Sequence, residues 1–230
     1  RQQRDRSLRF THHTMLYHTS SRQVVQEEDR HCVERTFADA NYRLPVGLRR
    51  LAKLWQEDFR AVSLRVSPVL PVPDDFRELE RYVAECVNRL EDNNRLVLLV
   101  NGTEPEAPNF EAGPVWRVLV GGNKLSRGYT IEGLTTSYFR RGTGAADTLM
   151  QMGRWFGYRP DYEDLCRVHL PPDSINWYAH IAEASEELRQ QIKRMRRDGL
   201  SPRQFGLYVR SHPDSLLITA PNKMRYAQSV

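Results

Sequence analysis

Two continuous apolar runs constrain the fold of this chain most: RLVLLVN at residues 95–101 and VWRVLVGG at residues 115–122. A strand with one wetted face alternates polar and apolar residues, whereas these runs do not alternate. They therefore predict strands that are buried on both faces, as in a parallel sheet. Further strand-like runs lie at residues 13–20, 134–140 and 165–170.

Segments with helical patterns separate these strands. Apolar residues recur at helical spacing in segments 21–40, 76–91, 145–157 and 173 to about 197. Strands that alternate with helices predict an α/β fold with a mostly parallel sheet flanked by helices. We expect residues 1–172 to form this domain and residues 173–230 to form a mainly α-helical C-terminal extension.

Pro45 can open another helix, which carries Leu48, Leu51, Leu54, Trp55 and Phe59 at helical spacing. A proline-rich connection follows at residues 67–75. We therefore expect a helical insertion around residues 40–75.

The composition excludes several classes of protein. Cys32, Cys86 and Cys166 are isolated and odd in number, which argues against a disulfide framework or a zinc module and is typical of a cytoplasmic protein. We expect no metal site. No run approaches the roughly 18 apolar residues of a membrane span, so no membrane partner is expected. The chain opens on charged residues without Met, which predicts that it is a piece of a longer protein.

Positive charge is concentrated between residues 117 and 159. This window holds two acidic residues, Glu132 and Asp147, and seven basic ones: Arg117, Lys124, Arg127, Arg140, Arg141, Arg154 and Arg159. Their balance equals the formal net charge of the whole chain, +5. Basic residues among glycines after an apolar strand are typical of a phosphate-binding surface, because Gly lets backbone N–H groups approach an anion and Arg donates in a planar fork.

GGNKLS at residues 121–126 is not a Walker A loop, and no other segment supplies one. The chain alone should therefore not hydrolyse ATP.

Two motifs in the basic window resemble those of superfamily-two helicases. LSRGYTIEGL at residues 125–134 resembles motif V, which contacts nucleic-acid backbone and ATP. QMGRWFGYR at residues 151–159 resembles motif VI, the arginine-finger element.

Longer segments extend the resemblance to one family. VGGNKLSRGYTIEGLTTSYFRR, DTLMQMGRWFGYRPDYEDLCRVHLP and GLSPRQFGLYVRSHPDSLLITAPNKMR are similar to the Z1 domain of helicase-like ATPases found in prokaryotic restriction systems. The likeness covers most of residues 95–225 and extends weakly to the strand at 13–20. Residues 1–12 and 45–75 match nothing in that pattern.

The resemblance implies a RecA-like second lobe of an ATP-dependent DNA translocase. ATP and Mg²⁺ would bind only together with an N-terminal P-loop lobe of the same protein, and the partners would be double-stranded DNA and a nuclease subunit. Arg154 and Arg159 would be the candidate arginine fingers. The implied nucleotide contacts are Gln151, Gly153, Gly128 and Thr130, and the implied DNA contacts are Lys124, Ser126, Arg127, Arg140 and Arg141.

A second interpretation is a non-catalytic interaction module that docks a nuclease subunit. Two departures favour it: Thr130 stands where motif V usually has Asp, and the two arginines of motif VI are five residues apart instead of three. Arg154 and Arg159 would then form structural ion pairs with Asp161, Glu163 and Asp164. Nuclease activity in this chain is not expected, because no Asp or Glu stands two residues before a Lys.

Each of two further sequence patterns is compatible with two interpretations. The basic run RQQIKRMRR at residues 189–197 fits a solvated helix face paired with nearby glutamates, or a contact with DNA or a partner. The aromatic residues Trp155, Phe156 and Tyr158 fit a core or a base-stacking platform.

Overall fold

The structure is a computed structural model that describes residues 1–2, 5–92, 96–100, 108–122, 130–140, 146–153, 156, 159–201, 204 and 208. The chain divides into two compact units. One comprises residues 1–141 and 155–169, and the other comprises residues 142–154 and 170–230. Each unit is described separately.

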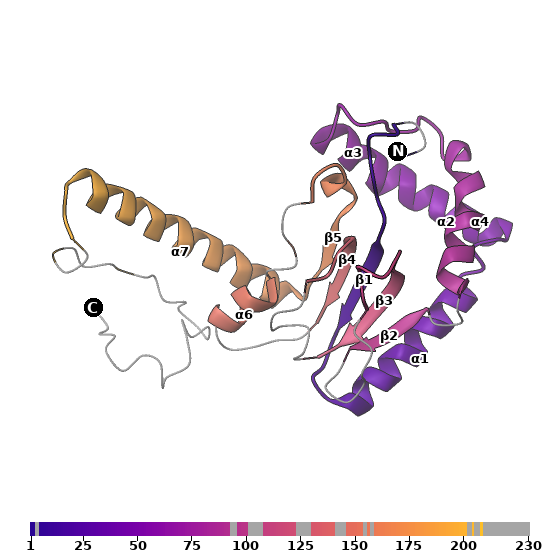
Figure 1. The fold of residues 1–230 in the computed structure, drawn as a ribbon, viewed down its shortest axis with the longest axis horizontal. Coiled ribbons are helices and arrows are strands. Elements are labelled where there is room, and N and C mark those ends of the chain that lie inside the picture. Colours follow the sequence, from indigo (N-terminus) through magenta and orange to yellow (C-terminus); the bar gives the residue numbers. More distant parts are fainter. Residues whose placement is uncertain are drawn as a thin grey trace. The chain divides into compact units, whose positions relative to one another are not determined.

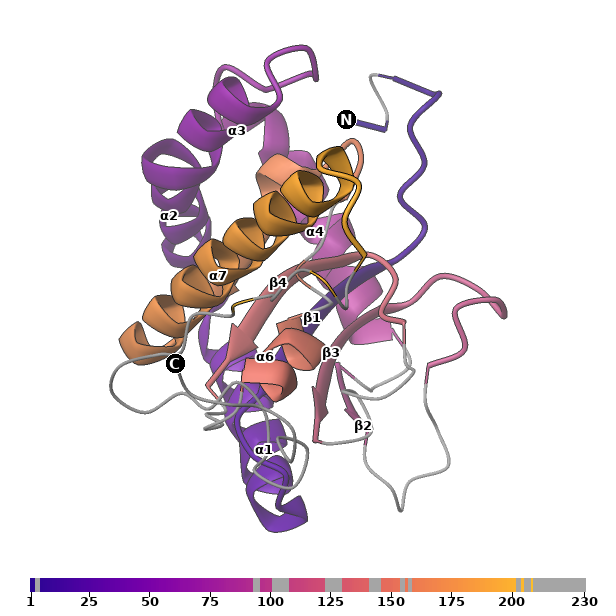
Figure 2. The same ribbon diagram turned by 90° about the vertical axis from the view of Figure 1, so that its left-hand side faces the viewer.

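The first unit is built on a sheet whose described strands are all parallel (Figures 1 and 2). The five strands lie in the order β2-β3-β1-β4-β5. They are β1 (His13–His18), β2 (Val97–Val100), β3 (Trp116–Gly121), β4 (Leu134–Phe139) and β5 (Arg167–His169). The predicted α/β fold with a parallel sheet flanked by helices is confirmed.

The two runs without alternation form the strands that were expected from them. In β3 the last four residues, Val118 to Gly121, are all buried. In β2 three of the four residues are buried. By contrast, β1 alternates, because Thr14, Leu16 and His18 are buried while the residues between them are partly exposed. Continuous burial therefore marks β2 and β3 as strands covered on both faces.

Helices from the long connection between β1 and β2 cover one face of the sheet (Figure 1). These are α1 (Gln23–Asp39), α2 (Pro45–Leu54), α3 (Arg60–Val66) and α4 (Arg77–Glu91). Val33 of α1 packs against a buried cluster of Val97, Leu99, Val118 and Val120. The regular apolar pattern of β2 and β3 thus provides the surface on which α1 is held.

The segment expected as a helical insertion is helical over most of its length. A π-helical turn, Trp55–Phe59, joins α2 to α3 without a break. Such turns are rare and shift the side chains that follow them around the helix. The turn directs Asp58 and Phe59 toward β5, where both contact Arg167.

The second unit contains α6 (Ala146–Gly153) and α7 (Pro172–Arg197), which pack against each other. Tyr178 of α7 donates a hydrogen bond of 2.9 Å to the carbonyl oxygen of Leu149 in α6. The expected C-terminal helix is therefore present, and it begins at a proline in its first turn.

Candidate functional site

The carboxyl ends of three neighbouring strands form one edge of the sheet, which we call the carboxyl edge. β1 ends at His18, β3 at Gly121 and β4 at Phe139. The register pairs Tyr17 with Val120 and His18 with Phe139, so these ends lie side by side (Figure 2). From β1 the chain continues to β2 and β3 on one side of β1. It then crosses to β4 and β5 on the other side. Ligands of open parallel sheets bind at such a change of direction.

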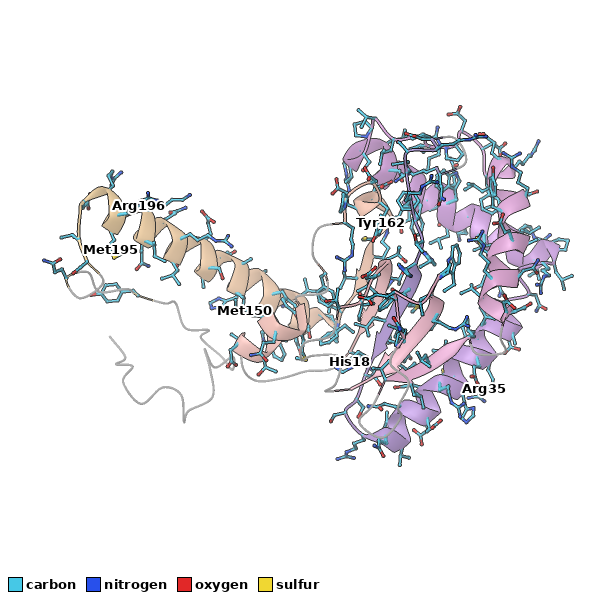
Figure 3. All side chains as sticks on the ribbon, viewed as in Figure 1. His18, Arg35, Met150, Tyr162, Met195 and Arg196 are labelled. Carbon is cyan, nitrogen blue, oxygen red and sulfur yellow. The ribbon has the colours of Figure 1, made fainter. Side chains whose placement is uncertain are left out.

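A buried histidine joins the three strand ends (Figure 3). His18 is 0% exposed, and its Nδ1 is hydrogen-bonded to the carbonyl oxygen of Gly121. Because a carbonyl oxygen only accepts, Nδ1 carries the hydrogen of this bond. The imidazole ring lies 5.1 Å from the ring of Phe139, and the His18 carbonyl accepts a 2.9 Å hydrogen bond from the backbone N–H of Arg140.

The turn after β1 is closed by a buried amide. Nε2 of Gln26 donates a 3.0 Å hydrogen bond to the carbonyl oxygen of Ser20, and Gln26 is 1% exposed. A Cβ atom at Gly122 would lie 2.6 Å from that Nε2 and 3.2 Å from Cα of Ser21. Gly122 is therefore required by the close approach of the turn, and the start of the loop after β3 is held against the start of α1.

Arg140 is the predicted site residue that lies directly at this edge. It follows the last residue of β4, its backbone is anchored to His18, and its side chain is exposed. Thr130 is also exposed. It precedes Gly133, whose carbonyl oxygen accepts a 2.9 Å hydrogen bond from the N–H of Thr14 near the amino end of β1. Thr130 thus belongs to the segment that returns from the carboxyl edge toward the amino ends of the strands.

Arg159 lies beside β4 and β5 rather than at their carboxyl ends. It lines a cavity of about 20 Å³ with Leu134, Ser137, Cys166 and other residues of these strands and their flanks. Its Nε atom is buried. Burial raises the pKa of the Cys166 thiol, and the nearby Arg159 guanidinium opposes this shift. Arg159 is therefore part of the packing between β4 and β5.

The acidic residues proposed as structural partners of Arg159 have other contacts. Asp164 is 0% exposed and is hydrogen-bonded to the guanidinium of Arg1. Burial alone would raise the pKa of Asp164, but the hydrogen bonds and the positive charge of Arg1 oppose burial, and the pKa is lowered. The carbonyl oxygen of Asp161 also accepts a hydrogen bond of 3.0 Å from Arg1.

Two predicted nucleotide contacts lie in α6 of the second unit. Gln151 is exposed. Gly153 is partly buried, and a Cβ atom there would lie 2.9 Å from the ring of Tyr178. The packing of α6 against α7 thus gives Gly153 a structural reason to lack a side chain. The remaining predicted site residues lie outside the described residues: Lys124, Ser126, Arg127, Gly128, Arg141 and Arg154.

Sequence reasoning missed His18 and Gln26. The signal for His18 was present, because HTMLYH alternates and places this imidazole on the same face as the buried Leu16. Nothing in the local pattern marks Gln26, whose burial results from the close approach of Gly122. Through their hydrogen bonds to Gly121 and Ser20, the two residues fix the backbone at the carboxyl edge.

The described residues contain no group of three or more His, Cys, Asp and Glu side chains arranged to hold a metal ion. Among the helices of the described chain, none is both long and apolar enough to cross a membrane.

Comparison with known proteins identifies one family. The model of the Z1 domain family matches residues 1–217. Neither a curated protein nor a solved structure matches the chain significantly. The family match includes β1, the helical segment at residues 45–75, all strands of the sheet and α7. The chain therefore belongs to the Z1 domain family.

Proposed function

We propose that this Z1 domain is the second lobe of an ATP-driven, helicase-like DNA translocase of a restriction (DNA-defence) system. The observation that supports the proposal is the arrangement of the carboxyl edge. The segment with Lys124 and Arg127 begins directly after Gly122, and the pair Arg140–Arg141 begins directly after β4. The two basic segments start on opposite sides of the central strand β1, as expected for a surface that contacts phosphate groups.

The exposed residues at this edge fit an anion. Arg140 presents a guanidinium, while its backbone is held by a hydrogen bond to His18. Because the backbone of Arg140 is already fixed, only its side chain has to be ordered when it binds a phosphate, which lowers the entropy cost of binding. α1 begins a few residues after His18, so its positive N-terminal dipole faces the same edge. ATP and Mg²⁺ would bind between this lobe and a P-loop lobe, and there they would supply the chemistry of phosphoryl transfer.

Of the two candidate arginine fingers, we favour Arg154. Arg159 is packed beside β4 and β5 with its Nε buried, and Ser137 and Cys166 line the same small cavity. A finger must reach the γ-phosphoryl group across the cleft between two lobes, which requires an extended, accessible guanidinium. Arg159 is thus better suited to pack against β4 and β5 and to act as a positioning residue.

The experiment is DNA-stimulated ATP hydrolysis by the full-length protein with Arg154→Ala, Arg159→Ala or the control Arg35→Ala, whose side chain is exposed on α1. Arg154→Ala should lower kcat at least about 100-fold with a small change in KM, because a finger acts mainly in the transition state. Arg159→Ala should chiefly lower the melting temperature. Normal turnover by Arg154→Ala would contradict the finger assignment, and absence of any DNA-stimulated ATPase in the unmodified protein would contradict the motor.

The second candidate function, a module that docks a nuclease subunit, is favoured by apolar side chains on the helical insertion. Leu54 and Leu64 are each 48% exposed, Val66 is 44% exposed and Val69 is 91% exposed. Several exposed apolar side chains within one short segment of the chain fit an interaction surface. Under this function, Leu64→Glu would abolish copurification of a nuclease subunit while ATPase activity, where present, stays unchanged.

A further inference from the structure

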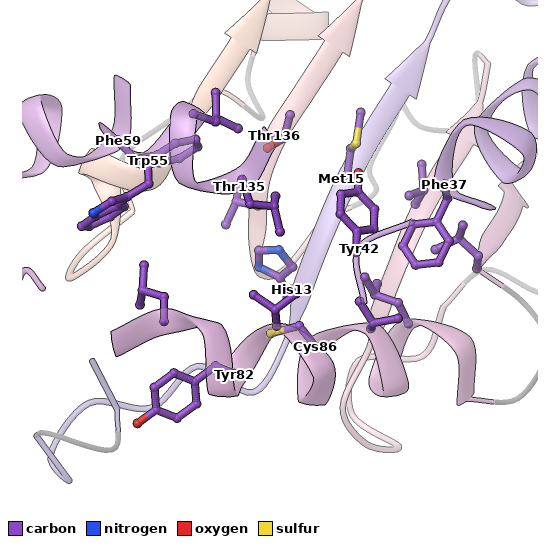
Figure 4. Close-up of a pocket in the computed structure, with 18 of the residues that line it drawn as sticks. His13, Met15, Phe37, Tyr42, Trp55, Phe59, Tyr82, Cys86, Thr135 and Thr136 are labelled. Atoms are coloured by element: carbon purple, nitrogen blue, oxygen red, sulfur yellow. The ribbon is translucent and has the colours of Figure 1, made fainter. Parts of the chain in front are cut away.

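A large apolar cavity, here called the apolar chamber, lies in the first unit between the sheet and the helices from α1 to α4 (Figure 4). Its volume is about 500 Å³. His13 and Met15 of β1 line its floor, and Trp55, Phe59 and Tyr82 line its other sides. A chamber of this size lies in the range typical of small-molecule sites.

Trp55 contributes apolar ring surface to the apolar chamber. Trp55 is 9% exposed, and its Nε1 has no hydrogen-bond acceptor within the described residues. This atom is itself buried, so a molecule in the chamber would contact the ring of Trp55 and not its N–H group. Desolvation by the surrounding side chains lowers the pKa of His13, although the residue is exposed, so this imidazole is neutral at neutral pH and adds no charge to the chamber.

A second cavity, here called the basic chamber, has a volume of about 830 Å³ and lies near the amino ends of β1 and β3. Its acidic lining residue, Glu85, is bonded to Arg89 at 2.6 Å. Arg6 and Arg9 also line it, both are exposed, and neither makes a hydrogen bond or ion pair with any part of the chain that the structure describes. Two unpaired guanidinium groups at one cavity fit an anion.

The two chambers adjoin each other. Leu79, Tyr82 and Cys86 of α4 line both of them. Cys86 also lines a cavity of about 460 Å³ beside β1 and β4, which shares His13 with the apolar chamber. The side of α4 that bears Leu79, Tyr82 and Cys86 thus borders both the apolar chamber and the chamber where Arg6 and Arg9 lie.

We propose that the two chambers together bind an amphipathic organic anion, whose acyl or aryl body occupies the apolar chamber and whose carboxylate or phosphate head contacts Arg6 and Arg9. A neutral apolar molecule would leave the arginines unpaired, and a small inorganic anion would leave the apolar chamber empty. This inference is independent of the motor function, because the chambers lie away from the carboxyl edge.

Thiol labelling of the 230-residue chain tests the inference, with dodecanoate as the probe. Cys86 lies where the chambers meet, Cys32 is exposed on α1, and Cys166 is partly buried but lines neither chamber. Dodecanoate below its micelle concentration should slow alkylation of Cys86 at least about fivefold and leave Cys32 and Cys166 unchanged. Equal protection of Cys166 would indicate general stabilisation and would overturn the proposal.

Matched ligands and variants separate the two halves of the site. Acetate should not protect Cys86, and dodecanol should protect it less than dodecanoate. The double variant Arg6→Gln/Arg9→Gln should weaken dodecanoate binding about tenfold or more and leave dodecanol binding unchanged. The control Arg35→Gln/Arg196→Gln removes the same charge from exposed positions and should bind like the parent (Figure 3). Unchanged dodecanoate binding by the Arg6/Arg9 variant, or stronger protection by AMP than by dodecanoate, would overturn the assignment.

Discussion

Arg167 binds Asp58 through two parallel hydrogen bonds, each of 2.9 Å, although 109 residues separate them. The same guanidinium lies 4.2 Å over the ring of Phe59 and donates from Nη1 to the carbonyl oxygens of Asp164 and Cys166 at 2.8 Å. A bidentate pair of this geometry holds the π-helical turn against the edge strand β5.

This pair predicts a pH dependence of stability. The hydrogen bond from Arg167 is the largest cause that lowers the pKa of Asp58 in the folded state. Because the folded pKa is below the unfolded value, the stabilisation is complete above about pH 4 and is lost as the pH falls through the folded pKa. Asp58→Asn should therefore cost about 1 kcal/mol at neutral pH, a value discounted because the carboxylate is 38% exposed.

Urea unfolding at about pH 7 and at about pH 3 checks this prediction. The difference between the parent and Asp58→Asn should shrink at the lower pH. Asp39→Asn is the control, because Asp39 is exposed at the end of α1 and its carboxylate makes no hydrogen bond or ion pair with the residues that the structure describes. A difference that stays constant with pH would show that the charge of Asp58 does not act through Arg167.

Gly122→Ala should destabilise the domain by about 1–3 kcal/mol, because the new Cβ would lie 2.6 Å from Nε2 of Gln26. In a Gln26→Ala background the same substitution should cost less, since the obstructing amide is gone. Thermal melting of the two single variants and the double variant gives the coupling energy.

Tyr178→Phe should lower stability by about 1 kcal/mol through loss of the hydrogen bond to Leu149. Burial raises the pKa of Tyr178 to about 12. A phenol whose pKa is higher in the folded state than in the unfolded state favours folding below about pH 10, and that advantage is lost as the pH rises toward 12. Unfolding curves between about pH 9 and 11 should show a smaller loss in Tyr178→Phe than in the parent, since other groups with a raised pKa, such as Tyr162, remain in the variant.

DNA binding by the isolated chain should be independent of sequence and strongly dependent on salt. Each neutralised phosphate of duplex DNA contributes about −0.9 to the slope of log K against log[salt], so three to five contacts give roughly −3 to −5. Arg140→Gln should reduce the magnitude of this slope by about 0.9, whereas Arg35→Gln should leave it unchanged. Fluorescence anisotropy with duplexes of two unrelated sequences measures both properties. Strong sequence selectivity would contradict the proposed backbone contacts.

The helices and strands could be predicted from the sequence because their buried apolar residues form continuous runs or recur at regular spacing. The apolar runs around Leu98 and Leu119 predicted β2 and β3, and the pattern from Phe76 to Glu91 predicted α4 almost to the residue. The strand at 165–170 is shorter than predicted, with β5 limited to Arg167–His169. β5 buries little of its surface, and Val168 at its centre is 42% exposed, so burial leaves a weak pattern there.

Contacts between distant side chains could not be predicted in this way. Nothing in the sequence near Asp164 indicates Arg1, 163 residues away, as its partner. The sequence offered only the neighbouring Arg154 and Arg159 as alternative partners of Asp164. Gly153 was interpreted from its motif as a nucleotide contact, but its closest constraint in the structure is the ring of Tyr178. Such relationships depend on how elements pack, which local patterns do not record.

The central position of β1 has a consequence for biosynthesis. The last residue of β1, His18, is bonded to Gly121, 103 residues further along, and the carbonyl oxygen of Thr14 accepts from Thr135, 121 residues further along. At about 5–20 residues per second, a ribosome needs roughly 5–25 s to deliver both neighbouring strands after β1 has emerged. During that interval the future centre of the sheet is an unpaired strand that other nascent chains and chaperones can bind. The yield of this domain in the cell therefore depends on how well that one strand is protected before its neighbours are made.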